Sequence, residues 1–296
     1  MQEALLNATG LNATGLNATE LNEEMDSIAS SKSSISSTSF SEPATNSSTK
    51  LLSKELKSDL QTYSPNKVFF CPEESHFYAQ CLEKMLLNQG TESITAVEFG
   101  AGDGSPVIHS LLKAPFAGEI HGFELNSAAC ELAQARIKQY QLHDKYFVHN
   151  HCFFEGLKSK NPQYLIANPP YIPAPDDDIC MPALHGGVDG ATITKKLLSV
   201  DCENVILMIS AYSNPIDTIE HAIDQGYQVS DFMVTPLQFG YYSSEPKVRN
   251  WITEMQRQRK AFYSANIYFL AGVLFQKKRH AGVDLSAELL QVMTAL

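Results

Sequence analysis

The 296-residue sequence predicts an α/β fold: a doubly wound, mainly parallel seven-stranded sheet with helices on both faces and an antiparallel hairpin at one edge. Two observations predict it. Short apolar runs of strand length alternate with segments that repeat apolar residues at helical spacing. A glycine-rich turn follows the first predicted strand and an Asn-Pro-Pro-Tyr segment ends the fourth, and open α/β sheets bind ligands at the carboxyl ends of their strands.

The strands are short apolar runs bounded by glycine, proline or polar residues. The first five are predicted at residues 93–100, 119–126, 146–153, 164–171 and 204–212. A helix follows the first strand, and a second helix covers 127–142, where one face carries Ala129, Leu132, Ala133, Ile137 and Tyr140. Two last strands, 227–237 and 267–276, lack an ordinary crossover helix between them, which favours antiparallel pairing at one edge.

The N-terminal part differs in composition from the rest. Residues 6–22 repeat the unit LNATG, and a serine-rich stretch follows. Such segments hold few large apolar side chains, so burial cannot offset the entropy lost on ordering them. We predict a disordered, low-complexity arm over residues 1–55, one domain over 60–280, and a C-terminal helix over 281–296.

Composition and charge narrow the class of protein. Hydrophobic residues make up 44% of the chain, and no apolar run approaches the ~20 residues of a membrane span. The N-terminus resembles neither a secretory signal nor a transit peptide, so we expect a cytoplasmic protein without membrane contact. A net charge of -11 disfavours long duplex nucleic acid, which binds basic surfaces. The six cysteines are scattered without a CxxC pair, which predicts reduced thiols rather than disulfides or a zinc site.

The turn after the first strand reads EFGAGDG. Glycines at this place let the backbone approach a ligand closely. The spacing G-x-G-x-G matches neither the pyrophosphate fingerprint nor a P-loop, so the predicted ligand carries no phosphate here. Glu98, a carboxylate before the turn, favours a cation instead. The candidate cofactor-binding residues of this segment are Glu98, Gly100, Ala101 and Gly102.

Glu124 ends the second strand, roughly 20 residues after the turn, where a carboxylate is placed to accept two ribose hydroxyls. Turn and carboxylate together indicate a nucleoside ligand. A nucleoside joined to a cationic, amino-acid-like group without phosphate describes S-adenosylmethionine.

The segment NPPY ends the fourth strand with Asn168, Pro169, Pro170 and Tyr171. The Asn168 side-chain oxygen and the Pro169 carbonyl supply two fixed acceptors for the hydrogens of an NH2 group. Tyr171 has a ring that stacks on a flat group bearing that nitrogen. Because the lone pair of such a nitrogen is delocalised, holding both hydrogens helps to direct it at a methyl donor by positioning and electrostatics. The structural alternative is a proline-rich loop.

These motifs, from Glu98 to Gly104, at Glu124 and in NPPY, resemble those of class I S-adenosylmethionine-dependent methyltransferases, which have a Rossmann-like fold. The continuation NPPYIP with PALHGGVDG (182–190) resembles more specifically the HemK-type protein-glutamine methyltransferases, which act on release factors. The segment 72–82 is similar to the family's Pro-Glu segment before the first strand.

The resemblance spans roughly residues 66 to 276 and implies that Asn168 and Pro169 bind the substrate amide. The family places an acid after the third strand against the adenine amino group, where this chain has Asn150 or His151, followed by Cys152. We add Leu125, His151, Cys152 and Asn168 to the cofactor-binding candidates. The chain departs from the family pattern in three ways. The family usually has a helical substrate-binding domain in front, where this sequence has the low-complexity arm. The family usually has Glu-Pro where this chain has Met181-Pro182, and the loop PDDDIC is unusually acidic.

We therefore predict an enzyme that transfers a methyl group from S-adenosylmethionine to an NH2-type nitrogen, with a glutamine amide in a protein as acceptor. The alternatives are adenine-N6 methylation of nucleic acid, for which a basic recognition domain is missing, and methylation of a small molecule. A non-catalytic binding module is a further alternative, opposed by the intact motifs. The sequence leaves the oligomeric state open.

Two further features of the sequence concern possible metal and partner binding. His149 and His151 share a face of the third strand by alternation and lie beside Cys152, but no further ligand follows at a suitable spacing, so no metal site is predicted. Residues 246–260 form a helix with an apolar stripe of Val248, Trp251, Ile252 and Met255. Its basic residues indicate either an ordinary surface helix or a docking patch for an acidic substrate.

Overall fold

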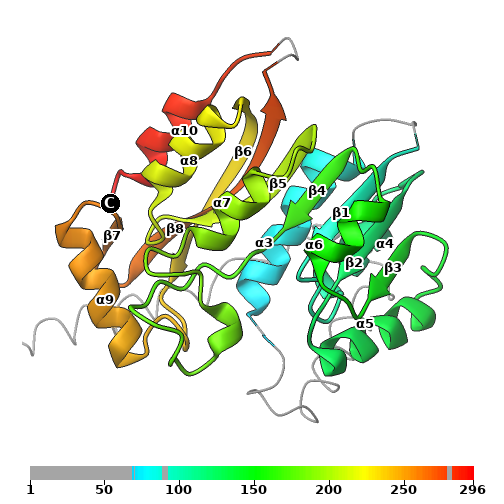
Figure 1. Cartoon of the computed structure of the whole chain (residues 1–296), viewed down its shortest axis with the longest axis horizontal. Helices are drawn as coiled ribbons and strands as arrows, with labels where there is room; N and C mark the ends of the chain where they lie inside the picture. The colour runs from blue at the N-terminus through cyan, green and yellow to red at the C-terminus, as the bar shows by residue number, and fades with distance from the viewer. Residues whose placement is uncertain (1–68, 70, 89–92, 279–281) are drawn as a thin grey trace, which may run out of the picture. The chain divides into compact units, whose positions relative to one another are not determined.

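The structure is a computed structural model that describes residues 69, 71–88, 93–278 and 282–296. Its sheet has the strand order β3-β2-β1-β4-β5-β8-β6 (Figure 1). The five parallel strands are β1 (Thr95–Phe99), β2 (Glu119–Phe123), β3 (Tyr146–His149), β4 (Tyr164–Ala167) and β5 (Asn204–Ser210).

An antiparallel edge completes the sheet. β8 (Ile267–Lys277) pairs antiparallel with both β5 and β6 (Tyr227–Gln238), and the short β7 (Tyr263–Ser264) pairs with β8. The predicted doubly wound sheet with an antiparallel edge hairpin is confirmed, and β7 makes the total eight strands instead of seven.

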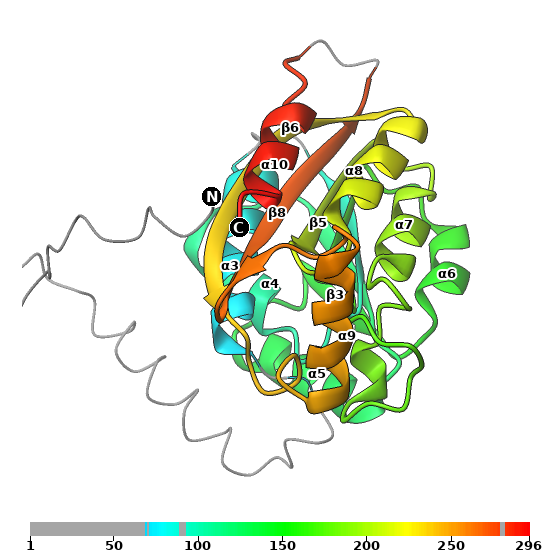
Figure 2. The same ribbon diagram turned by 90° about the vertical axis from the view of Figure 1, so that its left-hand side faces the viewer.

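Helices cover both faces of this sheet. The α-helices are α3 (Pro72–Leu82), α4 (Ser105–Lys113), α5 (Ser127–Gln139), α6 (Phe153–Gly156), α7 (Thr192–Leu198), α8 (Pro215–Asp224), α9 (Pro246–Arg257) and α10 (Ser286–Met293). Three short segments are η2 (Glu83–Leu87), η3 (Leu157–Ser159) and η4 (Pro182–Leu184). Figure 2 looks along the sheet, with α3 and α4 on one side and α7 and α8 on the other.

Alternation along the strands divides the interior into two cores. In β5, Ile206 belongs to the core beneath α3, α4 and α5, and Leu207 to the core beneath α7, α8 and α10. Both side chains are fully buried, and burying one such side chain contributes about 1.5–3 kcal/mol. The sheet is apolar on both faces because parallel strands are covered on both sides.

The strands end earlier than predicted, and the difference creates the site. β2 stops at Phe123 and β4 at Ala167, so Glu124 and Asn168 stand in the turns beyond the sheet. β3 stops at His149, so the expectation that His149 and His151 share a strand face is wrong. His149 stacks on His121, whereas His151 lies in the following turn.

The predicted arm, residues 1–55, lies outside the described residues. The C-terminal helix is found at Ser286–Met293, where it packs on α8 and β6 and so belongs to the same core as the sheet. Within the part of the chain that the structure describes, no helix has the length and apolar character that crossing a membrane requires.

Candidate functional site

A cavity of about 880 Å³ opens at the carboxyl ends of β1, β2 and β4. Pockets for small ligands span roughly 300–1,000 Å³, so the cavity has the size of a small-ligand site. The sequence-predicted residues that line it are Gly100, Gly102, Glu124, Leu125, His151, Cys152, Asn168, Pro169, Pro170 and Tyr171. Glu98 and Ala101 do not line it.

The glycine turn and Glu124 form one unit. Gly100 and Gly102 adopt left-handed backbone angles, with φ of 68° and 55°, which glycine adopts without strain. The Gly102 amide donates a hydrogen bond to Glu124 Oε2 (2.8 Å), and the Asn126 amide donates one to Oε1 (2.7 Å). The carboxylate is thereby held at the cavity wall, and each oxygen keeps a second lone pair for a ligand.

Glu98, predicted as a cofactor contact, lies beneath the turn and is not among the described residues that line the cavity. Its side chain is only 2% exposed and accepts hydrogen bonds from the hydroxyls of Tyr146 (2.5 Å) and Tyr78 (3.4 Å). Burial raises the pKa of Glu98 to about 7, although both hydroxyls act in the opposite direction. Ala101 is likewise buried, against β2, where a Cβ on Gly122 would lie 2.8 Å from its own.

Asn150 and His151 both follow β3 but have different surroundings. Asn150 donates hydrogen bonds from Nδ2 to the carbonyls of Glu124 (2.8 Å) and Leu125 (3.2 Å), so it fastens the turn after β2. His151 lines the cavity and is therefore the side chain placed to meet a ligand there. An aromatic cluster beside it was missed by the sequence reasoning; its members are Phe99, Phe153 and Phe154.

The NPPY segment presents unpaired polar atoms. Asn168 Oδ1 and the Tyr171 hydroxyl are buried and have no hydrogen-bond partner among the described residues. Buried polar side-chain atoms usually have a partner, and leaving one unpaired costs about 1–3 kcal/mol. Both residues line the cavity, so a bound ligand is the natural source of the missing partners. The Tyr171 ring itself packs against Tyr212, with centroids 5.9 Å apart.

Residues 182–190, PALHGGVDG, hold the backbone of the NPPY segment in place. The Ile172 amide donates to Leu184 O (3.0 Å), and the Gly186 amide donates to Ile172 O (2.9 Å). The Ser213 hydroxyl donates to Tyr171 O (2.6 Å). A Cβ on Gly186 would lie 2.6 Å from the Tyr171 Cα, so only glycine allows this close approach.

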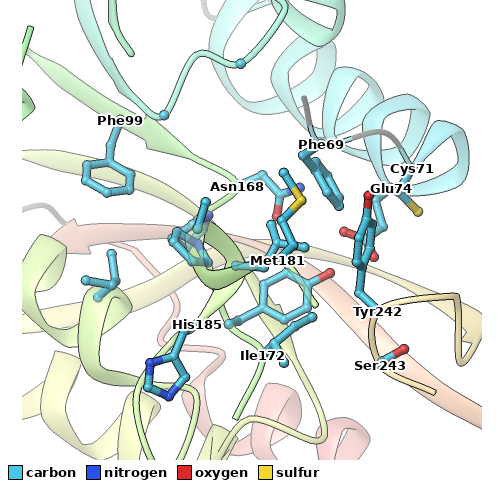
Figure 3. A pocket seen from close by; sticks show the side chains of 18 of the residues that line it. Phe69, Cys71, Glu74, Phe99, Asn168, Ile172, Met181, His185, Tyr242 and Ser243 are labelled. Atoms are coloured by element: carbon cyan, nitrogen blue, oxygen red, sulfur yellow. The ribbon is translucent and has the colours of Figure 1, made fainter. Parts of the chain in front are cut away.

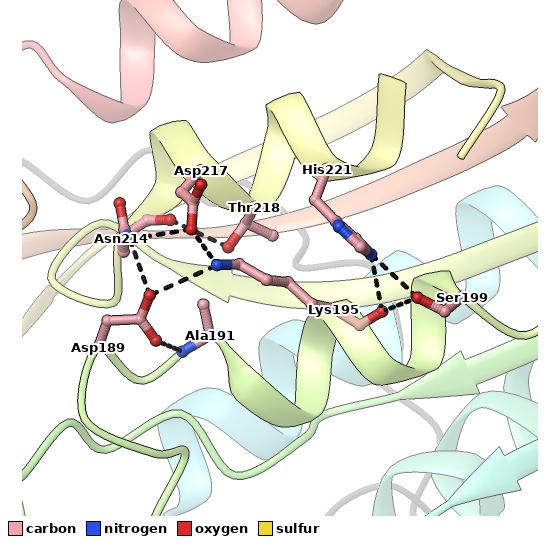
Figure 4. Close-up of polar contacts among 8 residues, drawn as sticks. All are labelled: Asp189, Ala191, Lys195, Ser199, Asn214, Asp217, Thr218 and His221. Atoms are coloured by element: carbon pink, nitrogen blue, oxygen red, sulfur yellow. Dashed lines mark hydrogen bonds and ion pairs between the residues drawn. The ribbon is translucent and has the colours of Figure 1, made fainter. Parts of the chain in front are cut away.

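The same loop is anchored to α7 and α8 through Asp189 (Figure 4). Asp189 accepts hydrogen bonds from the Ala191 amide (3.0 Å) and from Asn214 Nδ2 (2.8 Å). Lys195 Nζ lies 3.5 Å from Asp189 and also contacts Asp217. The loop that supports NPPY is therefore tied to the body of the domain by charge-assisted contacts.

One acid of the site was not predicted. Glu74 of α3 is 8% exposed, lines the cavity, and accepts a hydrogen bond from the Tyr268 hydroxyl (3.4 Å). Burial raises the pKa of Glu74, and the side chains of Tyr171 and Asn168, which face its carboxyl, act in the opposite direction. Figure 3 shows Glu74 and Asn168 on the same cavity, from α3 and from the end of β4.

The helix predicted at residues 246–260 is α9, and several of its apolar and basic side chains contact other parts of the domain. Val248, Ile252 and Met255 are buried, so its apolar stripe packs inward as predicted. Lys247 pairs with Asp176 of the acidic loop. The Arg249 guanidinium lies over the rings of Phe239 and Tyr263, 3.7 and 4.5 Å from their centroids. These contacts favour a structural role over a docking patch.

No group of three or more His, Cys, Asp or Glu side chains that could hold a metal ion occurs among the described residues. All six cysteines lie in the described part of the chain, and all are free thiols.

No family model matches the chain. Solved structures similar to it include a putative RNA methyltransferase from Pyrococcus horikoshii (14% identity, 76% of this chain and 98% of that chain, TM-score 0.47). A second is precorrin-6y C5,15-methyltransferase from Geobacter metallireducens (14% identity, 74% of this chain and 96% of that chain, TM-score 0.44). A third is TrmK from M. capricolum, solved with S-adenosyl-homocysteine (13% identity, 68% of this chain and 68% of that chain, TM-score 0.42). Likenesses of this strength do not establish an activity, and the fold assignment rests on the strand order itself.

Proposed function

We propose that the protein is an S-adenosylmethionine-dependent N-methyltransferase that acts on a planar NH2 group, with a glutamine side-chain amide in a protein as its acceptor. The observation that carries the proposal is the buried, unpaired Asn168 Oδ1 on the wall of a cavity that also contains the glycine turn and Glu124.

The residues present fit the donor. Glu124 is held where it can accept the two ribose hydroxyls, and the backbone of Gly100 and Gly102 lies open beside it, since a Cβ at either glycine would meet no atom within 4 Å. His151 and Phe153 offer flat side chains that line the same part of the cavity. When bound, this donor supplies an electrophilic methyl group.

The acceptor nitrogen is held by Asn168 and Pro169. Asn168 Oδ1 accepts one N–H and the Pro169 carbonyl accepts the other, which fixes the plane of the NH2 group and directs its lone pair out of that plane. The loop 182–190 keeps this backbone in place. Catalysis then rests on positioning and electrostatics without a covalent intermediate. The nitrogen takes the methyl group and releases one of its two hydrogens as a proton, and S-adenosylhomocysteine is the leaving group.

Two alternatives are less well supported. Nucleic acid is held mainly through its phosphates, yet no lysine or arginine occurs among the described residues that line the cavity. A non-catalytic module has no need of a buried, unpaired amide oxygen, which is costly unless it is used. Methylation of a small molecule uses the same contacts and is the second candidate, because the cavity has room for one.

The test uses S-adenosylmethionine labelled in the methyl group, a cell extract, and three proteins: the wild type, Asn168→Ala, and the matched control Asn161→Ala on an exposed loop. We expect label in the protein fraction for the wild type and the control. For Asn168→Ala we expect about 10²-fold less label at unchanged donor affinity, the scale for losing one preorganised polar contact. Full labelling by Asn168→Ala contradicts the proposed role, and label in a small-molecule fraction selects the second candidate.

A further inference from the structure

Glu74 is a buried acid without a counter-charge. The described residues contain no ion pair to its carboxyl, and the groups that face it are neutral: the Tyr268 hydroxyl donates a hydrogen bond to it, and Tyr171 and Asn168 lie beside it. Buried carboxyl groups are normally paired with a cation or neutralised, because an isolated buried charge is costly. Since Glu74 lines the cavity, a ligand can reach it.

Aromatic rings surround this carboxyl. Tyr212 packs against Tyr268 and Phe239 with ring centroids 4.7 and 5.3 Å apart, and Tyr171 packs against Tyr212. All four rings line the cavity. Aromatic faces attract cations, and a planar cation also stacks on them, so rings around a carboxyl form an environment suited to a planar positive group.

The acceptor atoms on this wall outnumber the hydrogens of one NH2 group. Asn168 Oδ1 and the Pro169 carbonyl already take both hydrogens of the methylated nitrogen, and the Glu74 carboxyl adds further acceptor capacity close to Asn168. A ligand that satisfies all of these atoms must therefore carry N–H groups beyond the methylated NH2.

We infer that Glu74 makes the acceptor half of the cavity selective for a planar, N–H-rich cation of the amidinium or guanidinium type, located at or beside the methylated nitrogen. In a protein acceptor, an arginine side chain next to the glutamine supplies such a group. The inference rests on the proposed function, which it deepens by naming positive charge as a feature of the acceptor.

The test compares two probes that share shape but differ in charge, benzamidine (cationic) and benzamide (neutral). Each is titrated calorimetrically into the full chain saturated with S-adenosylhomocysteine. The proteins are the wild type, Glu74→Gln, and Glu131→Gln as the control, since Glu131 is exposed on α5 and does not line the cavity. We expect the wild type and the control to bind benzamidine about tenfold or more tightly than benzamide, and Glu74→Gln to lose that preference.

Equal affinity for the two probes in the wild type overturns the inference, and this comparison does not depend on how any variant folds. A preference that persists in Glu74→Gln, or failure of both probes to bind at millimolar concentration, also overturns it. If S-adenosylhomocysteine itself does not bind, the proposed function fails separately. The same two probes in the cofactor-free protein then still show whether the site selects a cation through Glu74.

Discussion

Replacing Glu98 by glutamine tests the account of the glycine turn. Glu98 is buried beneath the turn, and burial raises its pKa from the ordinary value of 4.5 to about 7. Glutamine keeps the size of the side chain and can bond both hydroxyls, accepting from one through Oε1 and donating to the other through Nε2, but it cannot ionise. The substitution therefore isolates the effect of the buried charge.

The magnitude follows from the two pKa values. Between pH 4.5 and 7 the unfolded chain releases the Glu98 proton while the folded chain keeps it, so the folded wild type loses stability as the pH rises. At about 1.4 kcal/mol per pH unit, the interval from 4.5 to about 7 corresponds to a loss of roughly 3 kcal/mol. This loss is complete above the folded-state pKa and is absent in Glu98→Gln.

The assay is urea unfolding of the full chain and of Glu98→Gln at pH values from 4.5 to 8.5. Other titrating groups are common to both proteins, so they cancel in the difference between the two free energies of unfolding. We expect that difference to change by roughly 3 kcal/mol in favour of the variant as the pH rises. Parallel stability curves for the two proteins would refute the description of Glu98 as a buried acid with a raised pKa.

Three further predictions concern the cofactor site, the supporting loop and the N-terminal arm. Glu124→Ala should weaken S-adenosylhomocysteine binding by about 1–3 kcal/mol in calorimetry, while exposed Glu131→Ala should not; equal affinities would remove Glu124 from the site. Asp189→Ala should lower the free energy of unfolding by about 1–2 kcal/mol because the loop loses its contacts to the start of α7 and to α8, whereas exposed Asp177→Ala should be neutral in the same urea titration. Deleting residues 1–50 should leave the melting temperature and donor affinity unchanged, and a large drop in melting temperature would show that this arm is packed.

The sequence predicted the sheet well because its strands are locally encoded as apolar runs. It also located Asn168 and Glu124, since both follow such runs directly. The position of each strand end was less certain, because apolar residues such as Phe153 continue beyond β3 into α6. Periodicity alone does not distinguish a short buried strand from the start of a helix.

The two acids of the site show what sequence patterns leave out. Glu98 was expected to face a ligand, but Tyr78 and Tyr146 hydrogen-bond to its carboxyl. Tyr78 belongs to α3 and Tyr146 to β3, which is separated from β1 by β2, so only the tertiary fold brings these side chains together. Glu74 was not singled out because its relation to Asn168 joins α3 to the end of β4 across the fold. Contacts between residues distant along the chain depend on tertiary packing, which local spacing does not encode.

The most direct test of the central claim is calorimetric titration of the full chain with S-adenosylmethionine and with S-adenosylhomocysteine. We expect saturable binding of both at one shared site, with Asn168→Ala binding both as tightly as the wild type because the proposed role of Asn168 is to hold the acceptor nitrogen. Absence of binding by the wild type would contradict the assignment of the glycine turn and Glu124 to this cofactor, and with it the proposed methyl transfer.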